Sequence, residues 1–303
     1  MKLAAIWHVF KTATLDWQRH NAPRLGAAIA YYAIFSIAPL LVVAIAIAGS
    51  VFGQQAAKGE VFEQVNRFLG SEQAARAIED LVLSAARPRG GALATTLTFF
   101  ALWFGATGVF TQIKGALDII WEVERKPGVG WIATFIEYAW SIAMVAAVGL
   151  LLLASLVASS AMSAGVALAQ ARLPVSDLTL RSLDWSLSLV AITMLFAATF
   201  KFLPDVHVRW RDVWVGAAVT SVLFSIGKFV IGWYLARLVI ASAYGAAGSF
   251  VLVLVWTYYS AQIFLFGAEV TQAYVRQIGA KVLPTRRSRF ISSAEYQERL
   301  PRN

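Results

Sequence analysis

Six polar side chains lie inside segments that are otherwise apolar enough to cross a membrane, and they are the side chains best placed to do chemistry. They are Tyr32, Ser36, Lys228, Tyr258, Gln262 and Glu269. A charged group in hydrocarbon costs about 2.5–3.5 kcal/mol on insertion scales, so such groups are expected to face other helices or a hydrated cavity. A lysine in a cavity attracts carboxylate or phosphate groups. We therefore interpret the six as candidates for lining a substrate path.

Lys228 interrupts the apolar run "SVLFSIGKFVIGWYLARLV" at residues 221–239. One face of this predicted helix is small and polar, with Ser221, Ser225, Lys228 and Gly232 at helical spacing. Such a stripe is typical of a surface that packs against other helices. Two interpretations of the ammonium group stay open. It faces the protein interior or a wet cavity, or it snorkels toward an outer interface marked by Trp233 and Tyr234.

Further charges lie where predicted spans end. Lys201 lies at a depth similar to that of Glu269, and Glu137 begins the third apolar segment. We expect Lys201 to pair with Glu269 or with Glu137, and the alternative is that these charges only anchor helix ends. Pro39 follows Ser36 by three residues and removes a backbone hydrogen bond, which predicts a kink in the first span.

The composition is that of a membrane protein. Hydrophobic residues make up 59% of the 303 residues and charged residues only 14%, against about 25% charged in soluble domains. Six continuously apolar segments are long enough to cross about 30 Å of hydrocarbon as helices. They run over 26–52, 92–112, 134–160, 183–203, 213–239 and 247–272. The sequence thus predicts an all-α integral membrane protein with six transmembrane helices in one domain, 1–303.

The connections between these spans carry their own patterns. The fifth and sixth spans are joined by few residues, which predicts a tight helical hairpin that sets Lys228 level with Tyr258. The 53–91 loop shows apolar residues at helical spacing and predicts two short amphipathic helices, as a packed linker or as a lid over a cavity. A further amphipathic helix is expected at 114–124, after the second span.

That third amphipathic helix places Leu117, Ile120 and Trp121 on one face, and Asp118 and Glu122 on another. Its polar side is expected at the membrane boundary. Residues 276–303 form a basic tail that we expect to be solvated or in contact with lipid headgroups.

Positive charge predicts the orientation. The two chain ends and the loops 113–133 and 204–212 carry more than twice the lysines and arginines of the opposite side, so both termini are predicted in the cytoplasm. The net charge of +9 follows from basic cytoplasmic loops and does not indicate nucleic-acid binding. The run 26–52 is too long for the apolar part of a signal peptide, so we expect an uncleaved first span.

Three sequence blocks resemble the YihY/virulence factor BrkB family. They are "AAIAYYAIFSIAPLL" at 27–41, "IKGALDIIWEV" at 113–123 and "YGAAGSFVLVLVWTYYSAQIFLFGAEV" at 244–270. Their order and spacing match over nearly the whole chain, although Asp118 stands where many relatives have asparagine. The resemblance implies a six-span bacterial inner-membrane protein with both termini inside. Members have been labelled ribonuclease BN, serum-resistance factor or transporter, so the resemblance leaves the function open.

Several chemistries find no support in the sequence. The chain has no cysteine and no phosphate-binding glycine loop, and no metal-ligand spacing surrounds His8, His20 or His207. We therefore expect no catalysis, cofactor or metal. A cell-envelope transporter or flippase-like protein for a lipid or an amphiphilic anion fits best. The alternative is a non-catalytic scaffold or assembly factor of the envelope, and a ribonuclease is the weakest interpretation. The expected partners are membrane lipids and either an envelope protein or a second copy of the chain.

Overall fold

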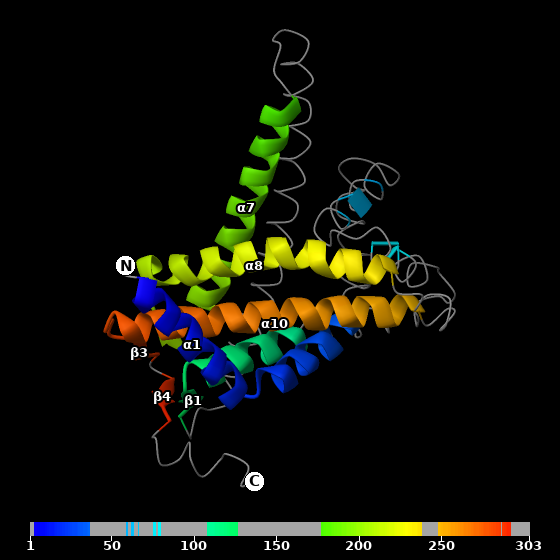
Figure 1. Cartoon of the computed structure of the whole chain (residues 1–303). Coiled ribbons are helices and arrows are strands. Elements are labelled where there is room, and N and C mark those ends of the chain that lie inside the picture. The colour runs from blue at the N-terminus through cyan, green and yellow to red at the C-terminus, as the bar shows by residue number, and fades with distance from the viewer. Residues whose placement is uncertain are drawn as a thin grey trace, which may run out of the picture.

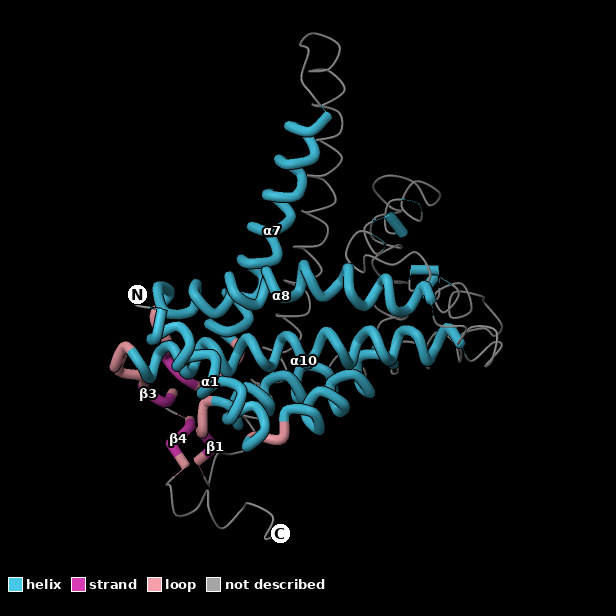
Figure 2. The backbone as a smooth tube through the Cα atoms, in the orientation of Figure 1, coloured by secondary structure: helices cyan, strands magenta, loops and turns pink. Residues whose placement is uncertain are grey.

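The structure is a computed structural model in which helices dominate (Figure 2). It describes residues 3–36, 108–126, 177–237, 248–285 and 287–291, with scattered positions between 59 and 79. The helices are α1 (Leu3–Arg19), residues 22–36, residues 108–120, α7 (Asp177–Phe202), α8 (Trp210–Arg237) and α10 (Gly248–Gln277). The third predicted span, most of the second, most of the 53–91 loop, Pro39 and Glu137 lie outside the described residues.

Two described stretches are long and apolar enough to cross a membrane. They are Trp210–Ile231 in α8 and Val251–Gln277 in α10, and α7 adds a shorter apolar stretch, Leu189–Phe202. The first two coincide with the predicted fifth and sixth spans. That the chain crosses the membrane six times stays a prediction.

The α8–α10 pair is the centre of the molecule, and the two helices run side by side (Figure 1). Their contact is reciprocal: Gly216 of α8 lies against Thr271 of α10, and Gly267 of α10 lies against Thr220 of α8. A Cβ atom at residue 216 would lie only 2.9 Å from the Cα atom of Thr271. Glycine is needed at both positions because only its missing side chain lets the backbones approach so closely.

The two threonines of this contact keep their hydroxyl groups satisfied within their own helices. Thr220 donates to the Gly216 carbonyl over 2.7 Å, and Thr271 donates to the Gly267 carbonyl over 2.8 Å. Buried hydroxyls without such bonds would cost free energy. The spacing of glycine and threonine by four residues on each helix therefore serves the packing and the hydrogen bonding together.

Helix α7 leaves the α8–α10 pair at a steep angle (Figure 1). Its contact is aromatic: the Phe196 ring lies 5.8 Å from the Phe224 ring and 6.2 Å from the Phe264 ring, centroid to centroid. A hydroxyl pair, Thr193 and Ser221 at 2.7 Å, adds a buried hydrogen bond between α7 and α8. The polar stripe predicted on α8 thus packs against a helix at Ser221, as expected from its residue types.

Helix α1 packs across one end of α10 through Val9, Ala13, Val270 and Ala273. The residues after α10 then turn back toward the protein. Strand β3 (Leu283–Pro284) pairs with β2 (Val206–His207), and β4 (Ser288–Phe290) pairs with β1 (Val123–Arg125), both antiparallel. The described part of the basic tail thus contains two short paired strands, and its exposure to water or to lipid headgroups stays a prediction.

The amphipathic helix expected at 114–124 ends earlier, at residue 120. Glu122 adopts a left-handed backbone conformation with φ 52°, and the chain then enters β1. The predicted apolar face is confirmed, since Leu117, Ile120 and Trp121 are all buried. It packs against the protein core, whereas the sequence pattern alone had suggested a helix at the membrane boundary.

We predict that Gly267→Ala destabilises the protein by about 1–3 kcal/mol, because the new methyl group would overlap Thr220. Gly115→Ala is the matched control, since nothing lies within 4 Å of a Cβ atom there, and it should be neutral or stabilising. Thermal unfolding of the detergent-solubilised protein checks both variants. Adding Thr220→Ala to Gly267→Ala should restore part of the loss, and a double variant no better than the single one would contradict this account of the contact.

Candidate functional site

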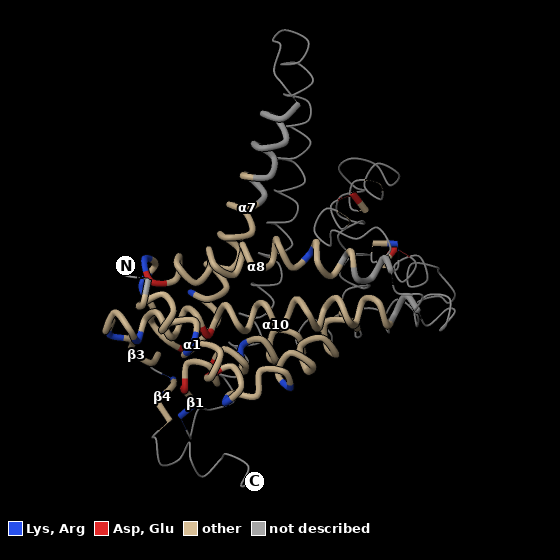
Figure 3. The backbone as a smooth tube through the Cα atoms, in the orientation of Figure 1, with Lys and Arg blue, Asp and Glu red and all other residues tan. Residues whose placement is uncertain are grey.

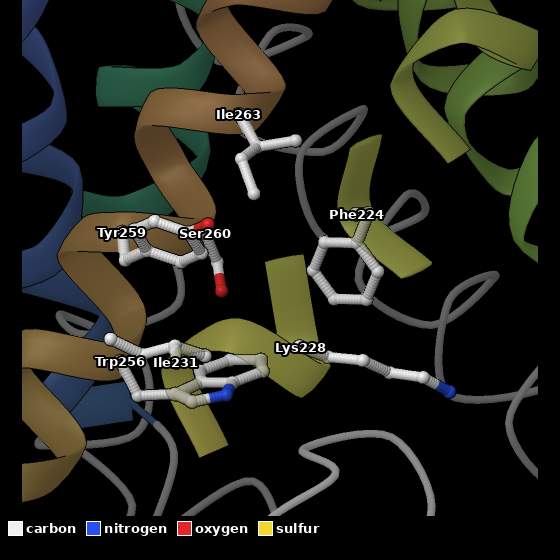
Figure 4. Close-up of a pocket in the computed structure, with 7 residues that line it drawn as sticks. All are labelled: Phe224, Lys228, Ile231, Trp256, Tyr259, Ser260 and Ile263. Atoms are coloured by element: carbon white, nitrogen blue, oxygen red, sulfur yellow. The ribbon is translucent and has the colours of Figure 1, made fainter. Parts of the chain in front are cut away.

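A small pocket lies between α8 and α10 at the level of Lys228 (Figure 4). It is lined by Phe224, Lys228, Ile231, Trp256, Tyr259, Ser260 and Ile263. The empty volume is about 140 Å³, and it is too narrow to admit a water molecule. The α10 residues of this lining run from Trp256 to Ile263, a stretch that contains Tyr258, the residue expected level with Lys228. The turn of the predicted hairpin lies outside the described residues.

Lys228 is half-buried, and it is the only charged residue of α8 between Asp212 and Arg237 (Figure 3). Its carbon chain lines the pocket, whereas its ammonium end points away from the other six lining residues (Figure 4). The Nζ atom lies 5.3 Å from the centre of the Phe229 ring, within the range of a cation–π contact. The described residues therefore place the lysine stem inside the helix pair and direct its charge outward from the pocket.

The other five candidate path residues do not gather at this pocket. Gln262 packs against Gly26, and its Nε2 atom lies 3.4 Å from the Ala22 carbonyl oxygen. Tyr32 packs against Gly108, and Ser36 donates to the Ala33 carbonyl over 3.0 Å. Tyr258 is 36% exposed and Glu269 is fully buried. Gln262 and Tyr32 thus hold helix 22–36 against its neighbours in the described structure.

Glu269 forms a buried ion pair with His20, which lies in the turn after α1. The Glu269 Oε1 atom is 2.7 Å from His20 Nδ1, and neither side chain is exposed. Lys201, the partner considered from the sequence, donates instead to the carbonyl of Val208. The second partner considered for Lys201, Glu137, lies outside the described residues.

Four more charged groups surround this pair. Arg276 lies 3.0 Å from Glu122 and 3.5 Å from Asp16, and Arg19 lies 3.6 Å from Glu122 and 3.8 Å from Asp16. With His20 protonated, three carboxylates face three cations. We call these six residues the charge cluster, and it joins α1, the turn after helix 108–120 and α10.

The charge cluster shifts the pKa values of two of its members, His20 and Glu122. Burial lowers the pKa of His20, but the carboxylates of Glu122, Glu269 and Asp16 outweigh it and raise this pKa to about 9. The His20 ring and the two nearby arginines lower the pKa of Glu122 to about 2, although its partial burial opposes this. His20 is therefore an imidazolium at neutral pH, and Glu122 is ionised.

Sequence reasoning missed His20, because all three histidines lie outside the predicted spans and no metal-ligand spacing surrounds them. The available signal was Glu269 itself, since a carboxylate inside an apolar span calls for a cation. His20 begins the turn between two helices, where Asn21 adopts a left-handed conformation with φ 53°. That turn folds the histidine back onto α10.

A second network surrounds Asp118. Its carboxylate accepts a 2.8 Å bond from the Asp205 backbone N–H and lies 3.0 Å from Lys114 Nζ. Lys114 also lies 2.5 Å from the Asp205 carboxylate. Burial raises the pKa of Asp118, which Lys114 and the Asp205 N–H partly offset. The network ties helix 108–120 to the loop after α7.

These two networks hold helices together. The part of the chain that the structure describes contains no group of three or more histidine, aspartate or glutamate side chains placed to hold a metal ion. Their chemistry is ion pairing and the holding of one proton on His20.

We predict that His20→Gln lowers the thermal stability of the protein at pH 6.5. The variant should also lose most of the dependence of thermal stability on pH above neutrality. The folded pKa of about 9 lies above the ordinary 6.5, so the pair stabilises fully below pH 6.5 and its contribution is lost as pH rises through 9. Breaking one partner of a buried ion pair costs about 3–5 kcal/mol. Melting curves from pH 6 to 10 check this, with exposed His8→Gln as control, and an unchanged pH slope in His20→Gln would refute it.

Asp118→Asn is expected to keep or raise stability at neutral pH. The amide oxygen still accepts the Asp205 N–H, and the substitution removes a buried carboxylate whose raised pKa makes its ionised form costly. Asp118→Ala should destabilise the protein by about 1–3 kcal/mol, because the Asp205 N–H then loses its acceptor. Denaturation midpoints of the two variants decide, and equal losses in both would show that the acceptor has no role.

Comparison with known proteins agrees with the resemblance seen in the sequence. The family model described as virulence factor BrkB matches residues 13–291. A UPF0761 membrane protein of Tolumonas auensis is 29% identical over 84% of this chain and 82% of its own length. A UPF0761 membrane protein of Verminephrobacter eiseniae is 30% identical over 89% of this chain and 63% of its own, and one of Paraburkholderia xenovorans is 26% identical over 83% and 56%.

The chain thus spans less than two thirds of the length of the second and third of these relatives, but most of the first. No solved structure matches. The family match covers both described span candidates, the charge cluster and the Lys228 pocket. The chain belongs to the virulence factor BrkB family of membrane proteins.

Proposed function

We propose that this membrane protein is a cell-envelope transporter or flippase-like protein that passes a lipid or another amphiphilic anion. We place it in the bacterial inner membrane with both termini in the cytoplasm, on the distribution of lysine and arginine along the chain. The observation that carries the proposal is Lys228, a half-buried lysine within an apolar helix, whose stem lines a pocket together with the hydroxyl-bearing Tyr259 and Ser260.

The depth of Lys228 supports this role. It lies 18 residues from the start of α8 and 9 from its end, or about 27 Å and about 14 Å along the helix axis. A cation at that depth is costly unless it meets an anion, a dipole or water. An anionic group that crosses beside α8, with its apolar part in lipid, would be attracted by this charge.

The pocket beside Lys228 is closed in this structure, so passage requires α8 and α10 to part at that level. Their contact differs along its length. At Gly216 and Gly267 the backbones approach closely, whereas at Gly227 the neighbours are the flexible ends of Ile263 and Tyr259. We expect the two helices to stay in contact at Gly216 and Gly267 and to separate near Lys228.

Transport in proteoliposomes tests the role of Lys228. We expect Lys228→Met, which keeps most of the length of the side chain and removes its charge, to slow the movement of a fluorescent anionic phospholipid between leaflets by about tenfold or more. Lys228→Arg should retain part of the rate. Lys281→Met is the matched control, because Lys281 is exposed beyond the end of α10.

Equal rates for wild type and Lys228→Met would remove this lysine from the mechanism. No transport by the wild type, together with a stable co-purifying envelope protein, would favour the scaffold alternative. A zwitterionic phospholipid in parallel separates a requirement for negative charge from a general loosening of the bilayer.

A further inference from the structure

A second cavity lies between the first turn of α8 and the last turn of α10. Its volume is about 200 Å³, and it is lined by Arg209, Arg211, Asp212, Tyr274 and Ile278. The transport step proposed for Lys228 uses none of these residues. Figure 3 shows charged residues gathered at this end of the α8–α10 pair, in contrast to the apolar length of both helices.

The charges of the lining do not cancel. Arg209 Nε donates to the Asp212 carboxylate over 3.1 Å, and Asp212 is buried, so these two neutralise each other. Arg211 forms no ion pair with another residue among those that the structure describes, which leaves one guanidinium in excess. A guanidinium presents donors in a planar fork that matches phosphate oxygens, and the Tyr274 hydroxyl adds a donor from α10.

The cavity lies at a level where lipid headgroups are expected. Trp210 and Trp214, in the first turns of α8, are 45% and 40% exposed. Exposed tryptophans at the end of an apolar helix are typical of the membrane interface. The distribution of lysine and arginine predicts that this interface is the cytoplasmic one, where basic pockets between helices suit phosphate-bearing headgroups.

We propose that this cavity binds a phosphate-bearing anion, with Arg211 as its main ligand and Tyr274 as a second donor. Asp212 holds Arg209 in place at the rim. The volume is below the 300–1,000 Å³ typical of sites for drug-sized ligands, so it suits a phosphate group and leaves the rest of the molecule outside. A phospholipid headgroup and a free phosphate share this chemistry.

The inference does not depend on transport. Arg211 and Lys228 are 17 residues apart on α8, or about 25 Å along its axis, so one phosphate group does not reach both. Binding at Arg211 is measured as affinity and the Lys228 role as a rate of lipid movement. Each therefore fails or holds separately.

The test measures binding to the full-length chain in detergent by calorimetry and by the shift in melting temperature. The probes are inorganic phosphate, dihexanoyl phosphatidylglycerol and, as a phosphate-free control, dihexanoylglycerol. We expect at least one of the two phosphate compounds to bind, and Arg211→Gln to weaken that binding on the order of tenfold or more. Arg24→Gln, an exposed arginine outside the cavity, should bind as the wild type does.

Binding of the phospholipid alone assigns the site to a headgroup, and comparable binding of inorganic phosphate assigns it to a soluble anion. Either result supports the proposal. It is overturned if neither compound binds, if dihexanoylglycerol binds as well as the phospholipid, or if Arg24→Gln loses as much affinity as Arg211→Gln. Tyr274→Phe, expected to weaken binding several-fold, keeps the test decisive should Arg211→Gln fold poorly.

Discussion

A carboxylate with no exposed surface, Glu269 of α10, sets the constraint on which the packing at one end of the molecule depends. An ionised carboxylate in an apolar surrounding is stable only with a cation and hydrogen bonds close by. His20 supplies both at 2.7 Å, and it lies in a turn that leaves α1. The pair therefore fixes α1 on α10, and Glu122 with Arg276 brings the turn after helix 108–120 to the same place.

The α8–α10 contact follows from a different kind of constraint, the absence of side chains. Gly216 and Gly267 let the backbones meet, and the threonine opposite each of them fills the remaining space without an unsatisfied hydroxyl. The charge cluster and this contact lie toward the same end of α10, since Gly267, Glu269 and Thr271 are adjacent along it. That end of the helix is held by ionic and by close steric contacts, whereas the Lys228 level is bordered by larger, more adjustable side chains.

Much of the helical architecture could be predicted from the sequence because apolar length and residue spacing are local properties. The segments that became α8 and α10, the buried face of Leu117 and Ile120, and the approximate level of Lys228 follow from helix rise and period alone. The partner of Glu269 did not follow, because His20 is 249 residues away in the sequence and no local pattern records the pairing. The pairing of strands β3 and β4 was also missed, because strands of two and three residues carry no periodic signal.

The candidate path residues divide by what they contact. Gln262 and Tyr32 meet glycines of neighbouring helices, so their conservative replacement tests packing before it tests transport. The stem of Lys228 lines the pocket between α8 and α10, and its ammonium group points out of that pocket (Figure 4). A charge at that depth is costly, so groups outside the α8–α10 contact must stabilise it. Among the six residues selected from the sequence, Lys228 is the one that lines this pocket, so its substitution tests the proposed path most directly.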